Sequence, residues 1–448
     1  MSLRVIHRYV PEGPLLFILA AVIGLLSGGC AWLLKHMIAY VSGLFTSGVR
    51  DGVFNLWLLV IPVAGLVLTG LLCRHVFHRN LSHGVRTLME RLSCHDYDMK
   101  PWHIVTPMLA STVTLGFGGS AGSEGPIACT GAAIGGNMGR WFGLTPRQVM
   151  LLIGCGAGAG IAGIFKAPLG GALFTIEVLR IPMGTVQVLM VLVSSIVAGV
   201  TAYMLGGCTM DLDLTAAFPR VDNSMVLLAL ALGVFCGLYS LYYSFVMKWM
   251  ERTLSRIRNP LLLNIAGGAV LAVALFLFPS LYGEGYGVIA RVLNGDADAV
   301  AACGVLGEAS PALPLLVGAC LCVVALKCFA TGATNSGGGV SGEFAPTLFA
   351  GCVAGLLFAL GAEWIFGLSL PVGLCALVGM CGVMSGAIRA PLMAIVLTVE
   401  MADAFGCFMP VMITGAVAFG VVRFFTTDGF YTRYLDRRNG LLWRMLRR

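Results

Sequence analysis

The chain alternates long uncharged apolar runs with short polar segments. Runs of about twenty residues are long enough to cross the roughly 30 Å hydrocarbon layer of a membrane as helices. The runs of about this length are 14–34, 56–73, 181–210, 223–247, 259–283, 344–362, 364–388 and 404–422. Shorter or glycine-interrupted runs cover 127–139, 148–165, 167–176, 311–326 and 390–399. Broken helices at membrane depth are tolerated only where they are buried in protein or line a cavity. The pattern predicts an all-α polytopic membrane protein, with residues 1–448 forming a single transmembrane domain of broken and tilted helices.

Composition excludes a soluble protein. Of 448 residues, 58% are hydrophobic and 11% are charged, whereas about 25% of residues are charged in soluble domains. The cysteines sit in apolar runs and are interpreted as small buried side chains. His75, His78, His83 and His95 share a stretch with Cys94 and several arginines, which indicates a polar interfacial segment rather than a metal site. We expect no cofactor and no metal.

Positive charge gathers in a few places, which sets the expected topology. The net charge is +7, and the basic clusters are the N-terminus, 74–100, 140–147, 248–258 and the tail 431–448. Because basic loops stay on the cytoplasmic side, we expect both termini in the cytoplasm and the chain in the plasma membrane. No A-x-A site follows the first run, so 14–34 is predicted to be a retained helix and not a signal peptide. Nothing in the chain suggests nucleic acid as a partner.

One sequence pattern occurs twice. Residues 167–179 read APLGGALFTIEVL and residues 390–402 read APLMAIVLTVEMA, which places the two copies 223 residues apart. A basic residue precedes each copy, Lys166 in the first and Arg389 in the second. Internal repeats in membrane proteins usually enclose a substrate site between them.

A glycine-rich stretch that ends in proline precedes each copy, and these stretches also repeat. Pro126 and Pro346 lie 220 residues apart. The similar offsets predict two inverted halves, 15–215 and 225–430, with the site at their interface.

The first glycine-rich stretch, GFGGSAGSEGP at 116–126, is the strongest candidate for chemistry. Pro126 is expected to open a helix, because proline is favoured in a first turn. Free N–H groups and the positive dipole end make such a helix start an anion site. The carboxylate of Glu124 either fills this site permanently, as a simple cap, or competes with a mobile anion for it.

The second stretch, GATNSGGGVSGEFAP at 332–346, has the same features, a glycine-rich approach and a proline expected to open a helix. The N–H groups of Glu343, Phe344 and Ala345 would point toward the membrane midplane, and in an inverted repeat both helix starts aim at one point. Neither stretch contains Arg or Lys. This favours an anion held by dipoles, weakly enough for rapid passage.

Several motifs in order resemble the chloride channel (CLC) family of channels and proton-coupled exchangers. GSEGP at 122–126 resembles the family's G-[RK]-E-G-P, and GEFAP at 342–346 resembles its G-x-F-x-P. FKAPLGGALFTIEVL at 165–179, YGEGYGVI at 282–289 and FYTRYLDRR at 430–438 resemble later segments. The resemblance covers about residues 15–440 and implies a homodimer in which each subunit holds its own pore.

The resemblance also implies roles for single residues. Glu124 would be the gating glutamate, with backbone groups of Ser123 and Gly125 near the gate. Backbone N–H groups of Glu343 and Phe344 would bind the central anion. The hydroxyl of Tyr431 would bind the same anion, unless Tyr431 belongs to an interfacial aromatic belt.

Four positions depart from the family pattern. His83 stands where the family has an anion-contacting serine; its ring can donate one hydrogen bond, or it points away. Ser123 replaces a basic residue, and Glu343 replaces an apolar one. Val178 occupies the position of the inner proton-relay glutamate and cannot titrate, so Glu343 becomes a substitute relay candidate, or faces the cytoplasmic vestibule and carries nothing. Glu177 and its repeat partner Glu400 are expected to have a shared structural role.

These observations predict transmembrane chloride transport, gated by a glutamate and either channel-like or loosely coupled to protons. Chloride and similar monovalent anions, and protons, are expected as substrates, with no enzyme activity and no nucleotide-binding motif. A stoichiometric chloride/proton antiporter and a fluoride-selective exporter of the same fold are the alternatives. A cation-coupled transporter would need carboxylates paired with unwound carbonyls, which the sequence does not show. A membrane enzyme or scaffold is the remaining class.

Overall fold

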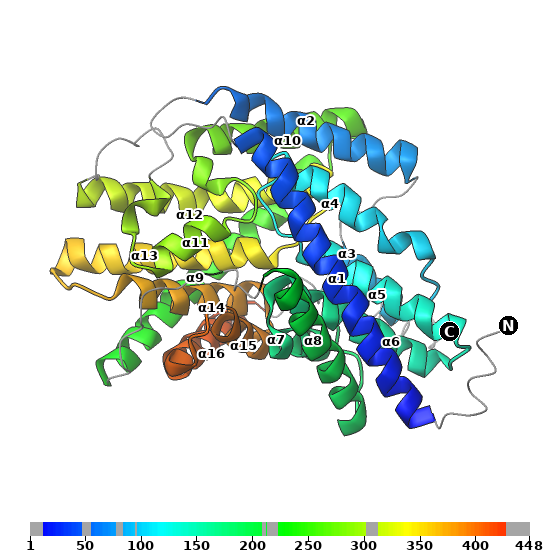
Figure 1. Cartoon of the computed structure of the whole chain (residues 1–448). Coiled ribbons are helices and arrows are strands. Elements are labelled where there is room, and N and C mark those ends of the chain that lie inside the picture. The colour runs from blue at the N-terminus through cyan, green and yellow to red at the C-terminus, as the bar shows by residue number, and fades with distance from the viewer. Residues whose placement is uncertain are drawn as a thin grey trace, which may run out of the picture.

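The computed structural model describes residues 12–46, 55–77, 84–94, 96–207, 212, 223–301 and 312–426. Across these ranges the chain forms sixteen α-helices and no named strand (Figure 1). In the first half they are α1 (Glu12–Thr46), α2 (Trp57–Leu71), α3 (Gly84–Ser93), α4 (Thr106–Gly116), α5 (Glu124–Trp141), α6 (Pro146–Phe165), α7 (Pro168–Leu173) and α8 (Thr185–Leu205). The others are α9 (Asn223–Leu254), α10 (Pro260–Leu277), α11 (Tyr286–Leu293), α12 (Leu313–Ser336), α13 (Phe344–Phe366), α14 (Val372–Ile388), α15 (Pro391–Met401) and α16 (Phe408–Phe425). The predicted all-α fold class is confirmed.

Helix lengths agree with a membrane protein of unequal spans. Nine helices in the described ranges are long and apolar enough to cross a membrane. Shorter apolar helices, including Val372–Ile388 and Pro391–Met401, lie among them. The prediction of one span over 364–388 was wrong at its start, because α13 continues to Phe366 and ends at Gly367, which is left-handed at φ 69°. Pro371 then precedes α14.

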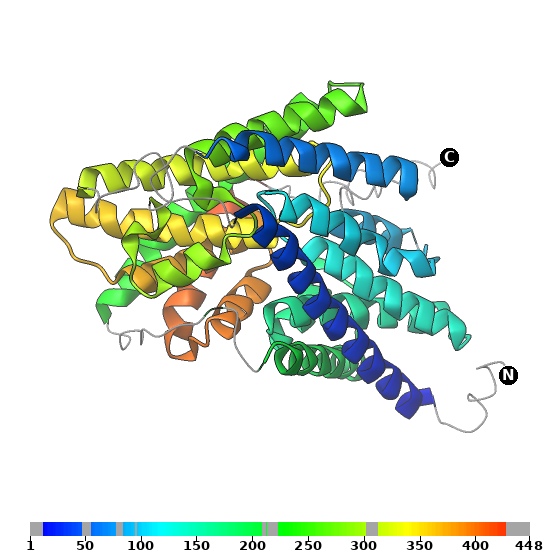
Figure 2. The ribbon, with the colours of Figure 1, turned by 45° about the horizontal axis from the view of Figure 1, so that its top comes forward.

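The two parts of the chain pack in the same way. α5 packs on α6 as α13 packs on α14, and α1 contacts α6 and α8 as α9 contacts α14 and α16. In Figures 1 and 2, α5 and α13 approach the middle of the molecule from opposite sides. Gly131 lies against the Gly156 carbonyl and Gly351 against the Gly379 carbonyl, where any Cβ would collide. Such small residues allow helix axes to approach closely. The proposed half boundaries, 15–215 and 225–430, stay a prediction.

The repeated basic residue that precedes each Ala-Pro-Leu has a structural explanation. Lys166 ends α6 and Arg389 ends α14, both in the left-handed region, at φ 53° and 63°. A positive side chain suits a helix C-terminus, where the dipole is negative. The prolines that follow, Pro168 and Pro391, open α7 and α15. The repeat therefore encodes two equivalent helix–turn–helix corners.

The Thr-Ile-Glu and Thr-Val-Glu ends of the repeat cap each other's helices. Glu177 accepts hydrogen bonds from the N–H groups of Leu392 and Met393 at the start of α15, at 3.3 and 2.7 Å. Glu400 accepts from Leu169 and Gly170 at the start of α7, at 3.0 and 2.9 Å. α7 and α15 are in contact. The structural role predicted for this pair is therefore seen as a reciprocal exchange of N-terminal caps across the interface.

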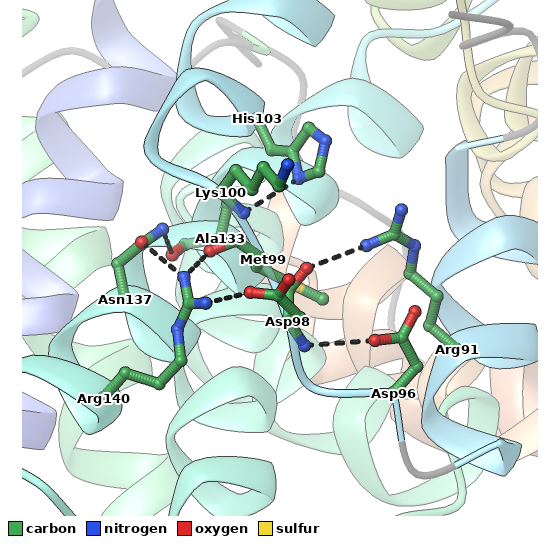
Figure 3. A network of polar contacts seen from close by, with 9 residues as sticks. All are labelled: Arg91, Asp96, Asp98, Met99, Lys100, His103, Ala133, Asn137 and Arg140. Carbon is green, nitrogen blue, oxygen red and sulfur yellow. Dashed lines mark hydrogen bonds and ion pairs between the residues drawn. The ribbon is translucent and has the colours of Figure 1, made fainter.

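The polar segment after α3 is an ordered network of hydrogen bonds (Figure 3). Arg140 at the end of α5 donates to the Asp98 carboxylate and to the Met99 carbonyl. Arg91 of α3 donates to the Asp98 carbonyl at 3.4 Å. In the described ranges no group of three His, Cys, Asp or Glu could hold a metal ion, while His78, His83 and His95 lie outside those ranges.

The reciprocal caps generate a stability prediction. Glu400→Gln removes the charge that complements the α7 N-terminus and leaves one acceptor for two N–H donors. We expect it to lower the free energy of unfolding by about 1–2 kcal/mol, the usual cost of losing an N-terminal cap. Thermal unfolding in detergent micelles measures this. Glu363→Gln, at an exposed position on α13, is the matched control, and equal midpoints for both variants would contradict the capping role.

Candidate functional site

The two glycine-rich stretches pair with each other at the centre of the molecule. Gly122 N–H donates to the Gly342 carbonyl at 3.0 Å, and Gly342 N–H donates to the Gly122 carbonyl at 2.6 Å. This antiparallel pair is the isolated β-bridge of the described residues. It fixes the starts of α5 and α13 beside each other.

Two threonine hydroxyls reinforce this pairing symmetrically. Thr114 of α4 accepts from the Val340 N–H, and Thr334 of α12 accepts from the Ser120 N–H, both at 3.1 Å. Each stretch turns through a glycine with positive φ, Gly118 at 94° in the first and Gly338 at 97° in the second. The backbone before each helix start is thus fixed by the opposite part of the chain.

Glu124 lies where the two helix starts meet. α5 begins at Glu124 and α13 at Phe344, each two residues before the proline expected to open it. The Glu124 side chain points across to α13, where Oε1 accepts the Ala345 N–H at 2.6 Å. Glu124 is 1% exposed, and its Oε2 has no hydrogen-bond partner among the described residues. The carboxylate thus lies at the N-termini of two helices, where N–H groups and helix dipoles favour negative charge.

Glycine is required around this carboxylate. A Cβ on Gly122 would overlap the Glu124 carboxylate, and one on Gly342 would lie 2.5 Å from its Oε2. Gly125 packs against the Ser341 carbonyl, 2.9 Å from where its Cβ would be. The carboxylate therefore sits in a cradle of glycines that no larger residue can form.

Three N–H groups at the start of α13 were predicted to point toward the midplane, and that of Ala345 makes the observed contact with Glu124. Phe344 is buried, and its ring meets Phe174 edge-on at 5.7 Å. The donor to Glu124 is Ala345, not Glu343 or Phe344. The Glu343 side chain is half-buried and accepts from the Asn335 amide at 3.4 Å. Glu343 thus faces α12, whose Asn335 also accepts from the Ser341 hydroxyl.

Ser123, which precedes the gate candidate, is bound by a second carboxylate. Its N–H donates to Glu284 Oε1 at 2.9 Å, and its hydroxyl donates to the same oxygen. Ser123 is fully buried. Glu284 belongs to the segment between α10 and α11, and it lines a cavity of about 660 Å³ together with Lys35 and His36 of α1.

A buried lysine holds the other end of the same stretch. Lys327 of α12 is 0% exposed, and its ammonium donates to the Ser120 hydroxyl at 2.9 Å. It also lies 4.5 Å from the Phe349 ring centroid. In the described part of the chain Lys327 makes no ion pair, although it interacts electrostatically with Glu284 and Glu124.

Comparison with known proteins identifies the architecture around this site. The family model described as voltage gated chloride channel matches residues 65–423. The chain belongs to this CLC family. CLC proteins transport anions, and in this chain the negatively charged Glu124 side chain lies at two helix N-termini.

Relatives of the chain carry channel and exchanger names. A putative ClcB-like chloride channel protein of Ralstonia nicotianae is 27% identical over 85% of each chain. The voltage-gated ClC-type chloride channel ClcB of Escherichia coli is 26% identical over 94% of this chain and 99% of its own. The H(+)/Cl(−) exchange transporter ClcA of Vibrio cholerae is 29% identical over 72% and 68%.

Solved CLC structures share the fold. A slow cyanobacterial Cl⁻/H⁺ antiporter superposes with a TM-score of 0.78 at 23% identity, over 94% of this chain and 97% of its own. A CLC-type fluoride/proton antiporter gives a TM-score of 0.72 at 24% identity, over 91% and 95%. The inverted, broken-helix CLC architecture is thereby shown.

The candidate residues of this CLC protein divide into those within the described ranges and those outside them. His83 and Tyr431 lie outside the described residues, so their anion contacts stay predictions. Val178 is buried in the π-helix Phe174–Val178 that follows α7, and the adjacent Glu177 accepts a hydrogen bond from the start of α15. Sequence reasoning missed Lys327 and Glu284. A lone charge in an apolar helix is functional by default, and this signal could have found Lys327.

The glycine cradle generates a double-substitution test. Gly122→Ala should displace the Glu124 carboxylate and lose its Ala345 hydrogen bond, at a cost of roughly 1–3 kcal/mol in unfolding free energy. On a Glu124→Ala background the same change should cost little, because the overlapping atoms are gone. Gly125→Ala is the control, since its Cβ meets the Ser341 backbone and is not relieved. Thermal unfolding of the variants in detergent measures the coupling, and equal costs on both backgrounds would contradict the cradle.

Proposed function

We propose that this CLC protein moves chloride through a pathway in each subunit of a homodimer, with Glu124 as the gate. The observation that carries the proposal is the Glu124 carboxylate itself, placed at the junction of two helix N-termini with one oxygen on the Ala345 N–H. A carboxylate and a chloride compete for the same N–H donors and dipole field. Transport then requires that Glu124 leave its cradle.

The proposed site suits weak binding of a desolvated anion. Its donors are backbone N–H groups, and the buried ammonium of Lys327 donates to Ser120 instead of to the Glu124 carboxylate. Dipolar ligands hold an ion without the strength of a direct ion pair, which permits rapid release. The anion is substrate, and no cofactor is part of the proposal.

We propose channel-like or loosely proton-coupled conduction. Val178 offers no titratable group at the family's inner relay position. Glu177 is committed to two N–H groups of α15, which argues against a mobile proton carrier there. Glu343 is the remaining acidic group near the α13 start, and its Asn335 contact supports a fixed position.

A stoichiometric chloride/proton antiporter is the second candidate. It is favoured by the exchange-transporter name of the Vibrio cholerae relative and by the superposition on the cyanobacterial Cl⁻/H⁺ antiporter. In that case Glu343 is the residue to carry the proton. A fluoride-selective exporter of the same fold is the third, because one superposable structure is a fluoride/proton antiporter.

The proposed orientation places both termini in the cytoplasm. Arg86 of α3 pairs with Glu251 near the end of α9 at 3.1 Å, so the basic end of α9 and the start of α3 share one side. With the N-terminus cytoplasmic, α1 crosses the membrane and brings Lys35 and His36 to the outer side. The cavity lined by Glu284 then opens outside.

Reconstitution distinguishes the modes of transport. Liposomes that contain the wild-type protein are loaded with chloride, and a chloride gradient is imposed while a pH dye reports protons. We expect chloride flux with weak or absent proton movement against the proton gradient. Stoichiometric proton movement would establish the antiporter, and Glu343→Gln would then be expected to abolish it while chloride flux survives. Fluoride and nitrate in place of chloride test selectivity.

The gate assignment has its own test. In Glu124→Ala no carboxylate competes for the site and none titrates, so chloride flux should persist and become independent of pH. Flux is measured with a chloride electrode across a series of external pH values. Glu363→Ala is the control and should keep the wild-type profile. A wild-type pH profile in Glu124→Ala would remove Glu124 from the gate.

A further inference from the structure

The segment that leads into α5 is held by two opposite charges. Lys327 binds Ser120 through its hydroxyl at 2.9 Å, and Glu284 binds Ser123 through N–H and hydroxyl. Ser123 directly precedes Glu124. The family pattern has a basic residue at this position, so here a positive charge beside the gate is replaced by a neutral serine with a bound carboxylate.

Glu284 joins the gate to open space. It lines the cavity of about 660 Å³ beside α1, while its Oε1 is bonded to the residue before Glu124. Glu284 also acts electrostatically on Glu124 and on Lys327. A carboxylate that leaves the glycine cradle toward this cavity therefore enters the field of a second carboxylate, that of Glu284, as well as that of the Lys35 ammonium.

We propose that Glu284 is a positioning residue of the gate that makes displacement of Glu124 depend on its protonation. This inference rests on the proposed function, in which Glu124 must leave its cradle for an anion to pass. Ser123 is the link, since its two hydrogen bonds fix Glu284 at the mouth of the pathway.

The net charge around the gate gives the reason. With ionised Glu124 in the cradle, the group of Glu124, Glu284 and Lys327 has a net charge of −1. If an anion takes the cradle and Glu124 leaves in its protonated form, the net charge stays −1. If Glu124 leaves ionised, the net charge becomes −2, and like charges at a partly buried site repel more than they do in bulk water. Glu284 therefore disfavours the ionised displaced form.

The contribution of Glu284 to the pH profile must be distinguished from those of the other titratable groups around the cavity. The charged and titratable groups that line the cavity or act on the gate are Lys35 and His36 of α1, Tyr282 before α11, Tyr286 of α11, Glu124 of α5 and Lys327 of α12. Burial raises the pKa of the Tyr282 hydroxyl to about 12, so it stays neutral at physiological pH. His36 is the neighbour that a control substitution must test, because it lines the same cavity.

The test compares pH profiles of chloride flux in liposomes. Glu284→Gln keeps an acceptor for Ser123 and removes the charge. We expect flux near wild type at about pH 5, where Glu124 is protonated, but about tenfold above wild type at about pH 9, where the ionised form of Glu124 predominates. Glu284→Asp keeps the charge and should restore the pH dependence. His36→Gln should leave the profile unchanged.

Outcomes separate this inference from the proposed function. If Glu284→Gln keeps the wild-type profile while Glu124→Ala flattens it, the role of Glu284 is overturned and the gate stands. If the wild type carries no anion flux, the proposed function itself fails. Should Glu284→Gln not fold, Glu284→Ser tests the same point, because a small polar side chain can be hydrated by the cavity. A Glu284→Ser variant that keeps the wild-type pH profile would likewise overturn the inference.

Discussion

The site depends on one pair of backbone hydrogen bonds, between Gly122 and Gly342. Two extended stretches from distant parts of the chain meet there and exchange N–H and carbonyl groups. The position of the Glu124 carboxylate follows from this contact, because it places the N-termini of α5 and α13 within reach of a single side chain. Side chains larger than hydrogen at either position would occupy the space that Glu124 fills. The glycines of these stretches are thus required for the Glu124 carboxylate to fit between the two helix starts.

Charge near this junction is balanced without direct ion pairing. Lys327 and Glu284 each bind a serine of the stretch that leads into α5, so hydroxyl groups separate both charges from the gate carboxylate. A direct pair between Lys327 and Glu124 would gain electrostatic energy but would hold the carboxylate in place. The separation leaves the Glu124 carboxylate without a direct ion pair to Lys327, as the proposed exchange with an anion requires.

The sequence predicted the helical architecture, the repeat and the approach of the two helix starts. These features depend on hydropathy, proline and glycine, which act locally and leave clear patterns. It named the N–H groups of Glu343, Phe344 and Ala345 together but not which of them contacts Glu124, because tertiary packing decides that choice. It also missed Glu284 and Lys327, since their significance comes from Ser123 and Ser120, which are distant in sequence. The turn at Gly367 was missed because the apolar run 364–388 continues across it.

The reciprocal caps of Glu177 and Glu400 affect how the chain is made. The acceptor in one half and the donors in the other are separated by 216 residues for Met393 and by 230 for Gly170. A ribosome releases α7 and Glu177 long before α15 has been synthesised. During that interval the α7 start and the Glu177 carboxylate must be satisfied by water or by the insertion machinery. The N–H groups at the start of α7 and the Glu177 carboxylate therefore gain their protein partners only after α15 has been synthesised. The two halves must then fold against each other late in biogenesis, as one cooperative step.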